Sequence, residues 1–425
     1  MADEDRVPTY RLYGRFARTM WLVAGGLTRA GWVRLVRRDR SGRWAADLLY
    51  RLGPAYVKMA QLLSTRRDQL PPAWCDRLAG LHDRVPVPPA PSIVATLHRA
   101  YGPELPFADF AWTPLAAGSI ATVHKGVLPD GRAVAVKVRR AGVAEALAID
   151  LALMSALARQ LRRVPGLRRV PLDEMVDQVG AAIRGQADLV AERRNIEALR
   201  ANLRGLGYVR VPATVEPLCT PDVVVMDLMP GLRPLRPAVI APEDRHELVV
   251  RTLTATYQML FVDGLVHCDL HHGNLYAAPD GQLVVLDAGF VVRLPDRVRR
   301  LFAEFFLCMG MGKGVRCAEI VMASAVRIAP DCDRAGFTDR LARLVTDMTG
   351  ARAGEFSLVR FATALFDLQR RHRIYAAPEF AFPLLALLVI EGMVNELHRE
   401  VDFQALAVPV LLRAMAAPAD TPVAA

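Results

Sequence analysis

Nine residues, Val266–Asn274, constrain the fold of this chain more than any other stretch. They read V-H-C-D-L-H-H-G-N and place His267, Asp269 and Asn274 in the spacing H-x-D-x-x-x-x-N. A second aspartate, Asp287, follows in the run V-V-L-D-A-G. Between the two aspartates lie a Pro-Asp-Gly turn signal and then a short apolar run typical of a strand. This order predicts a loop that carries chemistry rather than a solvated polar turn.

The spacing is that of the catalytic loop in protein-kinase-like phosphotransferases. Phosphoryl transfer depends on Mg²⁺ between phosphate oxygens and on a carboxylate that orients the nucleophile. Asp269 suits the orienting role, and Asn274 and Asp287 offer the hard oxygen ligands that Mg²⁺ prefers. His267 is expected to brace the loop. The chemistry therefore predicts ATP and Mg²⁺ as cofactors.

A loop of small residues lies upstream, followed by two strand-like runs around a Pro-Asp-Gly turn at 129–131. This pattern is typical of the hairpin that covers nucleotide phosphates, because small residues let the backbone approach anionic oxygens. Lys137 ends the second run, where an ammonium can pair with the α- and β-phosphates. The predicted contacts are Ala116, Ala117, Gly118, Ser119, Val123 and Lys137.

A strand followed by Pro-Gly at 223–231 predicts a hinge between two lobes. There Asp227 and Met229 are expected to contact adenine. The periodicity predicts helices over 143–162 and 173–205. On the second helix, Asp188 and Glu192 are predicted to share a face at i and i+4. Glu192 is the candidate partner of Lys137; a solvated glutamate is the alternative.

Composition limits the class of protein and its partners. Of 425 residues, 52% are hydrophobic and 23% charged, which is typical of globular rather than disordered chains. The net charge of +10 favours an anionic partner. No nucleic-acid recognition motif accompanies that charge, so we expect no nucleic-acid partner.

Residues 6–43 combine ten arginines with interleaved tyrosine, phenylalanine and tryptophan. Such a segment suits a helix on an anionic membrane surface. A packed helix with a solvated arginine face fits slightly better.

The six cysteines form neither a C-x-x-C pair nor a tight cluster, which favours a reducing compartment. We found no secretory signal and no apolar run of the ~18–20 residues that span a bilayer. The expected location is cytoplasmic, with peripheral contact to the inner face of the membrane as an option.

Gly53-Pro54 predicts the start of a helix on which Lys58 and Gln61 share a face at i and i+3. The chain holds only four lysines, Lys58, Lys125, Lys137 and Lys313, against a large excess of arginine. A lysine that persists in such a chain is a candidate for a role that arginine cannot fill. Lys58 and Lys137 both lie at positions predicted to carry chemistry.

Together these features resemble the UbiB (AarF/ADCK) family of atypical protein-kinase-like proteins, over roughly residues 45–410. The family's K-x-G-Q motif is present as Lys58-Met59-Ala60-Gln61, with alanine in place of glycine. Its alanine-rich loop corresponds to residues 116–119. Two positions depart from the family: Gln186 replaces the first glutamate of E-x-D, and Ala288 replaces the phenylalanine of D-F-G.

The resemblance implies an α+β, protein-kinase-like bilobal fold with an N-terminal helical extension across the active site and a mostly helical C-lobe. The expected parts are a basic segment (1–43), the extension (44–90), an N-lobe (91–228), a C-lobe (229–416) and a disordered tail (417–425). It adds Lys58 and Gln61 to the catalytic set of Asp269, Lys137 and Glu192.

The resemblance also implies Mg-ATP binding, ATPase activity and support of isoprenoid-quinone or other membrane-lipid metabolism. A lipid or quinone precursor is therefore an expected partner, and a homodimer stays open. Two alternatives remain. One is a small-molecule phosphotransferase of the aminoglycoside- or choline-kinase type, which the Lys58/Gln61 helix and the alanine-rich loop disfavour. The other is a nucleotide-sensing pseudokinase scaffold, which Gln186 and Ala288 leave open.

Overall fold

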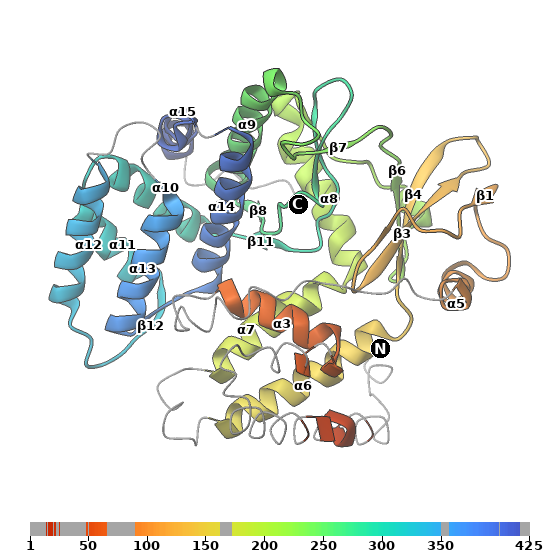
Figure 1. Ribbon diagram of the computed structural model, residues 1–425, viewed down its shortest axis with the longest axis horizontal. Helices are drawn as coiled ribbons and strands as arrows, with labels where there is room; N and C mark the ends of the chain where they lie inside the picture. Colours follow the sequence, from red (N-terminus) through yellow and green to blue (C-terminus); the bar gives the residue numbers. More distant parts are fainter. Residues whose placement is uncertain are drawn as a thin grey trace. The chain divides into compact units, whose positions relative to one another are not determined.

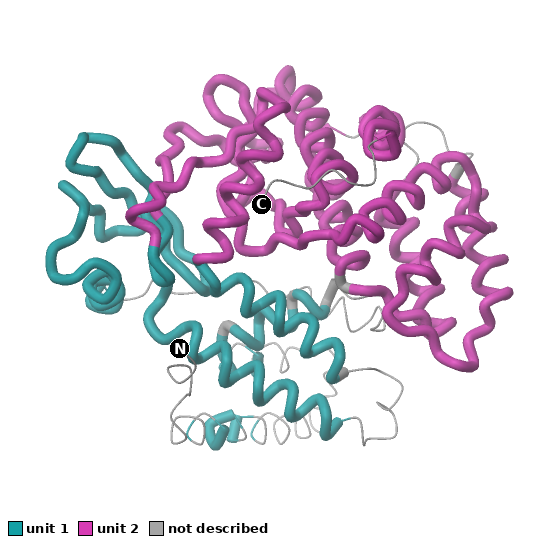
Figure 2. The backbone as a smooth tube through the Cα atoms, turned by 180° about the vertical axis from the view of Figure 1, so that it is seen from behind, with its two compact units in different colours: residues 1–189, 220–224 teal, residues 190–219, 225–425 magenta. Residues whose placement is uncertain are grey.

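The computed structural model describes residues 51–65, 90–161, 172–349, 357–398 and 400–416, together with residues 14, 16–19, 21, 22, 25, 48 and 49 (Figure 1). The predictions for segments 1–43 and 417–425 thus lie almost wholly outside the described residues. The chain divides into two compact units (Figure 2). Unit 1 comprises residues 1–189 and 220–224, and unit 2 comprises residues 190–219 and 225–425.

An antiparallel hairpin sheet belongs to unit 1, except for residues 225–227 of strand β6, which belong to unit 2. The strand order is β1-β3-β4-β6, and β2 pairs with β3. The strands are β1 (Asp109–Phe110), β2 (Ala116–Ala117), β3 (Ala121–Val127), β4 (Ala133–Arg139) and β6 (Val223–Asp227). The predicted turn between β3 and β4 is confirmed: Leu128 donates its N–H to Arg132 O at 2.9 Å, and Gly131 has φ +85°. Such a φ favours glycine, which explains the Pro-Asp-Gly signal.

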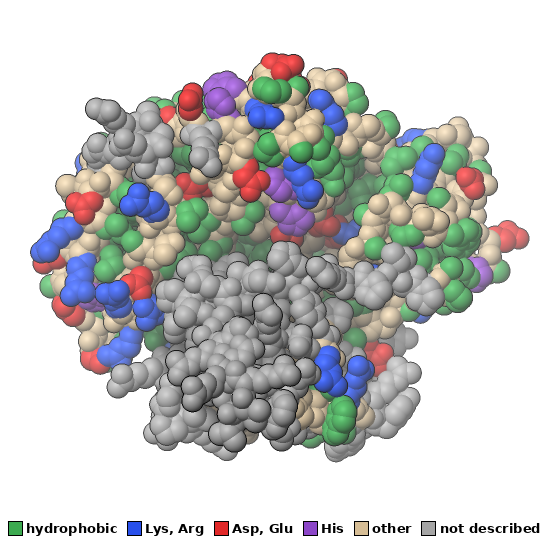
Figure 3. Space-filling view, in the orientation of Figure 1, with side chains coloured by type: hydrophobic (Ala, Val, Ile, Leu, Met, Phe, Trp, Pro, Cys, Tyr) green, Lys and Arg blue, Asp and Glu red, His purple; other side chains and the backbone are tan. Residues whose placement is uncertain are grey.

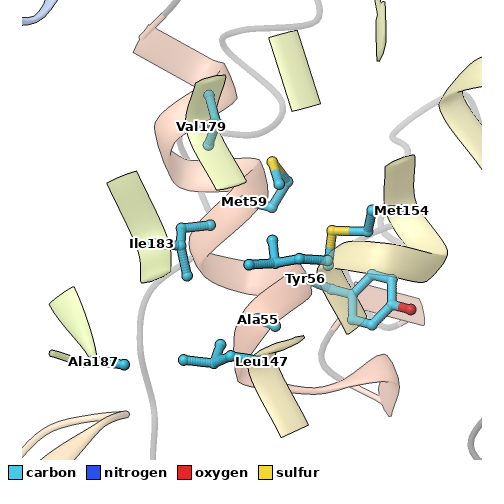
Figure 4. Packing of buried hydrophobic residues seen from close by; sticks show 9 residues of the cluster. Ala55, Tyr56, Met59, Leu147, Met154, Val179, Ile183 and Ala187 are labelled. Atoms are coloured by element: carbon cyan, nitrogen blue, oxygen red, sulfur yellow. The ribbon is translucent and has the colours of Figure 1, made fainter. Parts of the chain in front are cut away.

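Three helices of unit 1 pack around one apolar core. Helix α3 (Pro54–Thr65) begins at the predicted Gly-Pro pair and packs against α6 (Val143–Leu161) and α7 (Leu172–Gln186). Figure 4 shows Tyr56 and Met59 of α3 among side chains of both other helices, including Ile183. A Cβ atom on Gly180 of α7 would lie 3.3 Å from the side chain of Leu151, so glycine allows the two helices to approach closely. Helix α5 (Ala90–Tyr101) precedes the sheet.

The predicted helix over 173–205 is wrong in one respect, because it is two helices. Helix α7 ends at Gln186, and α8 (Leu189–Leu203) begins after a tight turn in which Ala187 donates its N–H to Arg184 O at 3.0 Å. Asp188 therefore precedes α8 and does not lie on a continuous helical face with Glu192. An aspartate at such a break favours a helix start, and hydrophobic periodicity alone does not reveal it.

Unit 2 is mostly helical, with short strand pairs near its start. A mixed sheet has the order β5-β10-β9-β7, and β8 pairs with β11. These strands are β5 (Val209–Arg210), β7 (Arg233–Pro234), β8 (Leu265–His267), β9 (Leu275–Ala277), β10 (Leu283–Val285) and β11 (Val291–Arg293). Helix α9 (Pro242–Tyr257) continues as a π-helical turn, η3 (Gln258–Asp263), which leads directly into β8.

The remaining helices form the body of unit 2. They are α10 (Asp296–Gly310), α11 (Gly314–Ala323), α12 (Arg334–Thr349), α13 (Leu358–His372), α14 (Pro378–Leu397) and α15 (Phe403–Ala416). A small antiparallel pair, β12 (Ala325–Ile328) and β13 (Ile374–Ala376), joins the α11 and α13 ends and was not expected. Buried phenylalanines fill the core, with the rings of Phe302 and Phe380 4.7 Å apart.

Helix α14 is long and apolar enough over Glu379–Leu397 to cross a membrane by length and composition. However, 67% of that window is buried inside the protein. Its Glu391 is 1% exposed and accepts the N–H groups of Leu358 at 2.8 Å and Val359 at 2.6 Å, which caps helix α13. These contacts fit a core helix.

Charges of both signs are interspersed over the α12 and α13 region on the face shown in Figure 3. Arg371 pairs with Asp367 at 2.6 Å, and Arg373 pairs with Asp331. Part of the excess positive charge is thus balanced locally. Exposed pairs of this kind contribute little stability.

Candidate active site

Three predicted nucleotide contacts align on one face of the unit 1 sheet. The register pairs Ala116 with Val123, and Val123 with Lys137. Residues directly opposite each other on antiparallel strands share a face. Lys137 is half-buried on this face, at the end of an apolar strand as predicted. The register thus places the small side chains of Ala116 and Val123 on the same face as Lys137.

The predicted phosphate loop at 116–119 is the tip of a hairpin. Ala116 and Ala117 belong to strand β2, so only Gly118 and Ser119 lie in the turn itself. Gly118 donates its N–H to Ala121 O at 2.9 Å, which closes the turn. Residues 116–118 are exposed. The strand pairing extends further along this loop than the sequence indicated.

The opposite face of the sheet is braced by a buried histidine. His124 is fully buried and stacks on Phe110 with ring centroids 5.2 Å apart. Its Nδ1 donates to Ala111 O at 2.9 Å, since a carbonyl can only accept. Its Nε2 then accepts from the hydroxyl of Thr122 at 3.0 Å. Burial lowers the pKa of His124, in agreement with this neutral form.

The extension helix carries the two predicted family residues. Lys58 is half-buried on α3, and Gln61 lies on the same helix, with a side chain outside the described part of the structure. At the end of α7, Gln186 is 8% exposed. Arg139 of β4 donates to Ala187 O at 3.3 Å, which joins the lysine-bearing strand to the end of α7.

In unit 2, the predicted residues of the H-x-D-x-x-x-x-N loop and Asp287 form one hydrogen-bonded network. His267 is fully buried; its Nδ1 accepts the Asp269 N–H at 3.1 Å, and its Nε2 bonds to Asp287 O. The Asn274 side chain donates from Nδ2 to Asp269 O at 2.8 Å, and the Asn274 backbone carbonyl accepts from Leu286 N at 3.0 Å. The structure thus brings Asp269, Asn274 and Asp287 together around His267, which braces the loop as predicted.

The tautomer of His267 follows from its partners. Nδ1 accepts from a backbone N–H, so Nε2 carries the proton and donates to the Asp287 carbonyl. Burial lowers the pKa of His267, and the nearby carboxylates oppose this effect. A neutral imidazole satisfies both bonds, whereas an imidazolium would lose the bond from Asp269.

The segment after β10 is held at successive carbonyls. Asp287 O is bonded to His267, Ala288 O accepts from Asn195 Nδ2 at 3.1 Å, and Phe290 O accepts from Cys268 N at 2.9 Å. Asp287 Oδ1 also accepts from Gly289 N at 2.8 Å. We call residues 287–290 the metal loop.

The donor set of this loop and of Asn274 fits Mg²⁺. The hydrogen bonds of the Asn274 amide use its nitrogen, which leaves its oxygen for a cation. Asp287 adds a carboxylate, and Mg²⁺ prefers one or two protein oxygens together with phosphate oxygens and water. Within the described ranges, no three His, Cys, Asp or Glu side chains are grouped to hold a metal without a nucleotide.

Asp269 remains reachable from solvent, with its side chain 33% exposed. His271 Nε2 lies 3.8 Å from Asp269 Oδ1, while His271 Nδ1 accepts from Gly273 N at 2.9 Å. Burial raises the pKa of the neighbouring Cys268 thiol, so Cys268 is a packing residue here rather than a nucleophile.

The predicted hinge follows strand β6. The Asp227 N–H is donated to Ala213 O at 2.9 Å and so is not the group that would bind adenine. The contacts of Asp227 and Met229 with adenine stay predictions. Gly231 has φ +68°, and a Cβ there would lie 2.9 Å from Pro279 Cγ, so the turn requires glycine.

Glu192 is 1% exposed on α8, and thus is not the solvated glutamate of the alternative reading. It belongs to unit 2 and Lys137 to unit 1, so their pairing stays a prediction. Asn195 and Phe290 were not among the residues predicted from the sequence. The available signals were the i+3 spacing of Asn195 from Glu192 and a phenylalanine two residues after Ala288.

A hairpin sheet that carries a lysine, a braced H-x-D-x-x-x-x-N loop and a mostly helical second unit are typical of kinase-like phosphotransferase folds. The domain family described as "ABC1 atypical kinase-like domain" matches residues 80–320. A "Probable protein kinase UbiB" of Shewanella woodyi is 31% identical over 393 residues, 89% of this chain and 71% of that protein. Its counterpart in Aeromonas salmonicida is 32% identical over 371 residues, 85% of this chain and 68% of that protein.

The chain therefore belongs to the ABC1 atypical kinase-like family, with UbiB-type relatives. Among solved structures, "The complex structure of Rv3197-erythromycin from Mycobacterium tuberculosis" aligns with a TM-score of 0.59 and 22% identity. The alignment covers 78% of this chain and 85% of that one. The predicted family and the α+β, kinase-like fold are confirmed. Membership of a kinase-like family implies use of ATP.

Proposed function

We propose that this protein binds Mg-ATP and either hydrolyses it or transfers its γ-phosphoryl group to a small-molecule or lipid acceptor. The observation that carries the proposal is the network in which His267 joins Asp269 to Asp287, while Asn274 bonds to Asp269 O and to the N–H of Leu286, the residue before Asp287. Such a network would set an orienting carboxylate beside two oxygens that could bind a metal. That arrangement is what phosphoryl transfer requires.

Each residue has a proposed role. Asp269 orients the attacking hydroxyl or water, and Asn274 with Asp287 would hold Mg²⁺. The ion would bridge phosphate oxygens and neutralise charge that develops on them. Lys137, oriented by Glu192, would bind the α- and β-phosphates beneath the 116–119 hairpin, and the backbone of Asp227 and Met229 would bind adenine. Lys58 and Gln61 would tune nucleotide preference from the extension helix.

The acceptor and pathway are proposed more broadly. The resemblance to the UbiB family is the support for a role in isoprenoid-quinone or membrane-lipid metabolism. A cytoplasmic location with peripheral membrane contact accords with that role. The pseudokinase scaffold is the second candidate, because Gln186 and Ala288 replace two family residues.

Turnover of the Asp269→Asn variant tests the proposal against the scaffold. We expect the variant to keep its affinity for Mg-ATP and to lose roughly 10²–10⁴-fold in ATP turnover, because Asn is a poor proton acceptor. The matched control is Asp280→Asn, at an exposed turn between β9 and β10. We expect it to match the wild type in both measurements.

Nucleotide binding without turnover in the wild type, or equal turnover in the wild type and Asp269→Asn, would support the scaffold. A lack of Mg-ATP binding in the wild type would reject both functions.

A further inference from the structure

The side chain of Asn195 hydrogen-bonds helix α8 to the metal loop. Asn195 Nδ2 donates to the Ala288 carbonyl at 3.1 Å, across 93 residues of sequence. Asn195 lies three residues after Glu192, so the two side chains occupy neighbouring positions on one face of α8. The helix that carries the proposed partner of Lys137 is thus joined to the loop that carries Asp287.

Ala288 gives this bond a particular importance. A phenylalanine at this position would hold the loop by packing, whereas the alanine side chain is small and 1% exposed. Phe290, two residues later, packs on Phe382 of α14 with ring centroids 5.4 Å apart, so its ring holds the end of the loop from another side. Between these anchors, the Asn195 amide donates a hydrogen bond to residue 288 itself.

We infer that Asn195 is a positioning residue that keeps Asp287 in place for the metal by holding the Ala288 carbonyl. Asp287 O is bonded to His267, and Phe290 O is bonded to Cys268 N. Without Asn195, the buried Ala288 carbonyl would lose its hydrogen-bond donor. Because an unsatisfied buried carbonyl is unfavourable, the loop would shift to bring this carbonyl to another donor or to water. The part of this inference that concerns the metal rests on the proposed function, whereas the hydrogen bond between Asn195 and Ala288 does not.

Two variants and one matched control test the inference. Asn195→Ala removes the donor, and Asn195→Asp replaces it with a second acceptor that repels the carbonyl. The control is Asn202→Ala, the same residue type seven positions later on α8, whose Nδ2 is buried with no hydrogen-bond partner in the described structure. It reproduces the change in helix propensity without the bond to the loop.

The first readout is hydrogen exchange in the nucleotide-free protein. We expect backbone amides of residues 287–290 to exchange faster in both Asn195 variants and at the wild-type rate in Asn202→Ala. Equal exchange in all four proteins, or equal acceleration in the control, would overturn the tie between α8 and the loop. This readout holds whether or not the protein binds ATP.

The second readout is a Mg²⁺ titration of the binding of a fluorescent ATP analogue. Because a single hydrogen bond is lost, we expect the Mg²⁺ concentration at half-saturation to rise roughly 3–10-fold, with metal-free nucleotide affinity unchanged. An unchanged half-saturation would refute the positioning role even if exchange had increased. If the wild type itself showed no Mg²⁺-dependent binding, the proposed function would be refuted. The hydrogen-exchange experiment would still test whether Asn195 holds the metal loop.

Discussion

At the scale of single residues, the two lysines with predicted chemistry differ in what surrounds them. Lys137 is half-buried on β4, opposite Val123. An ammonium in such a place pairs strongly with phosphate, because water competes less. Lys125 belongs to the same hairpin but is exposed.

We therefore expect Lys137→Ala to weaken Mg-ATP binding about tenfold or more, since a charged hydrogen bond contributes about 1.5–3 kcal/mol. Lys125→Ala provides the control on the same hairpin and is expected to bind normally. Isothermal titration of both variants measures the effect. If Lys137→Ala and Lys125→Ala bound Mg-ATP with equal affinity, Lys137 would not be the residue that contacts the phosphates.

Lys58 supports a different prediction. It lies on α3, outside the hairpin and the catalytic loop. We expect Lys58→Ala to change the preference between nucleotides, or the balance between hydrolysis and self-labelling by ATP, without lowering the melting temperature by more than a few degrees. Lys58→Arg should behave similarly, because a planar guanidinium does not reproduce a compact ammonium. Wild-type behaviour of both variants in all assays would make Lys58 a surface residue.

At the scale of elements, the π-helical turn η3, just before the catalytic loop, ends in a buried carboxyl group whose ionisation destabilises the folded state. Burial raises the pKa of Asp263, at the end of η3, from 3.8 to about 6, although Gln258 and Arg299 oppose the shift. The folded state therefore binds this proton more tightly than the unfolded state. The corresponding stabilisation is complete below pH ~4 and is lost as the pH rises through about 6.

Asp263→Asn cannot ionise and keeps an oxygen for Gln258, whose Nε2 lies 2.9 Å from Asp263 Oδ1. We expect the variant to be more stable than the wild type at pH 7.5 by about 1–3 kcal/mol, and to lose that advantage near pH 4. Urea unfolding at both pH values measures the difference. Asp280→Asn, at an exposed turn, should show no such pH dependence, and the same gain at both pH values would exclude ionisation as its cause.

Local signals in the sequence predicted most elements, and long-range pairing explains the misses. Gly53-Pro54 and the two Pro-Asp-Gly turns located a helix start and two hairpins, because glycine and proline restrict the backbone wherever they occur. The β12–β13 pair and the Asn195–Ala288 bond join residues far apart in sequence. Periodicity does not report such contacts. The break before α8 was missed because both helices continue the same apolar pattern.

At the scale of the whole molecule, the predicted site residues are distributed over two compact units. The hairpin residues and Lys137 belong to unit 1, and Glu192, Asp269, Asn274 and Asp287 belong to unit 2. The predicted residues of each unit could be found from motifs, since each motif is local. The domain boundaries at 43, 90, 228 and 416 remain predictions. The compact units divide at 189 and around 220–224 instead, which places α8 with the metal loop that it contacts.

The basic start of the chain gives a prediction for the molecule as a whole. If residues 6–43 bind membranes, replacing Arg34, Arg37, Arg38 and Arg40 with Gln should reduce sedimentation with anionic vesicles. Binding of the wild type should also fall with salt, because exposed charges are screened over ~8–10 Å at physiological ionic strength. Arg370→Gln and Arg371→Gln, on α13, make a control of the same chemistry elsewhere. Equal sedimentation of the wild type and the first variant would leave this segment without a membrane role.

The three anchored carbonyls of the metal loop also bear on inhibitor design. Some kinase inhibitors bind only when this loop has turned outward. Such a compound needs a loop that can move at a small free-energy cost, and it occupies the space that the loop phenylalanine leaves. Here an outward turn would break the bonds from His267, Asn195 and Cys268, and residue 288 has no ring to vacate anything. Compounds shaped to the loop in its inward position are therefore the better starting point for selective ligands of this protein.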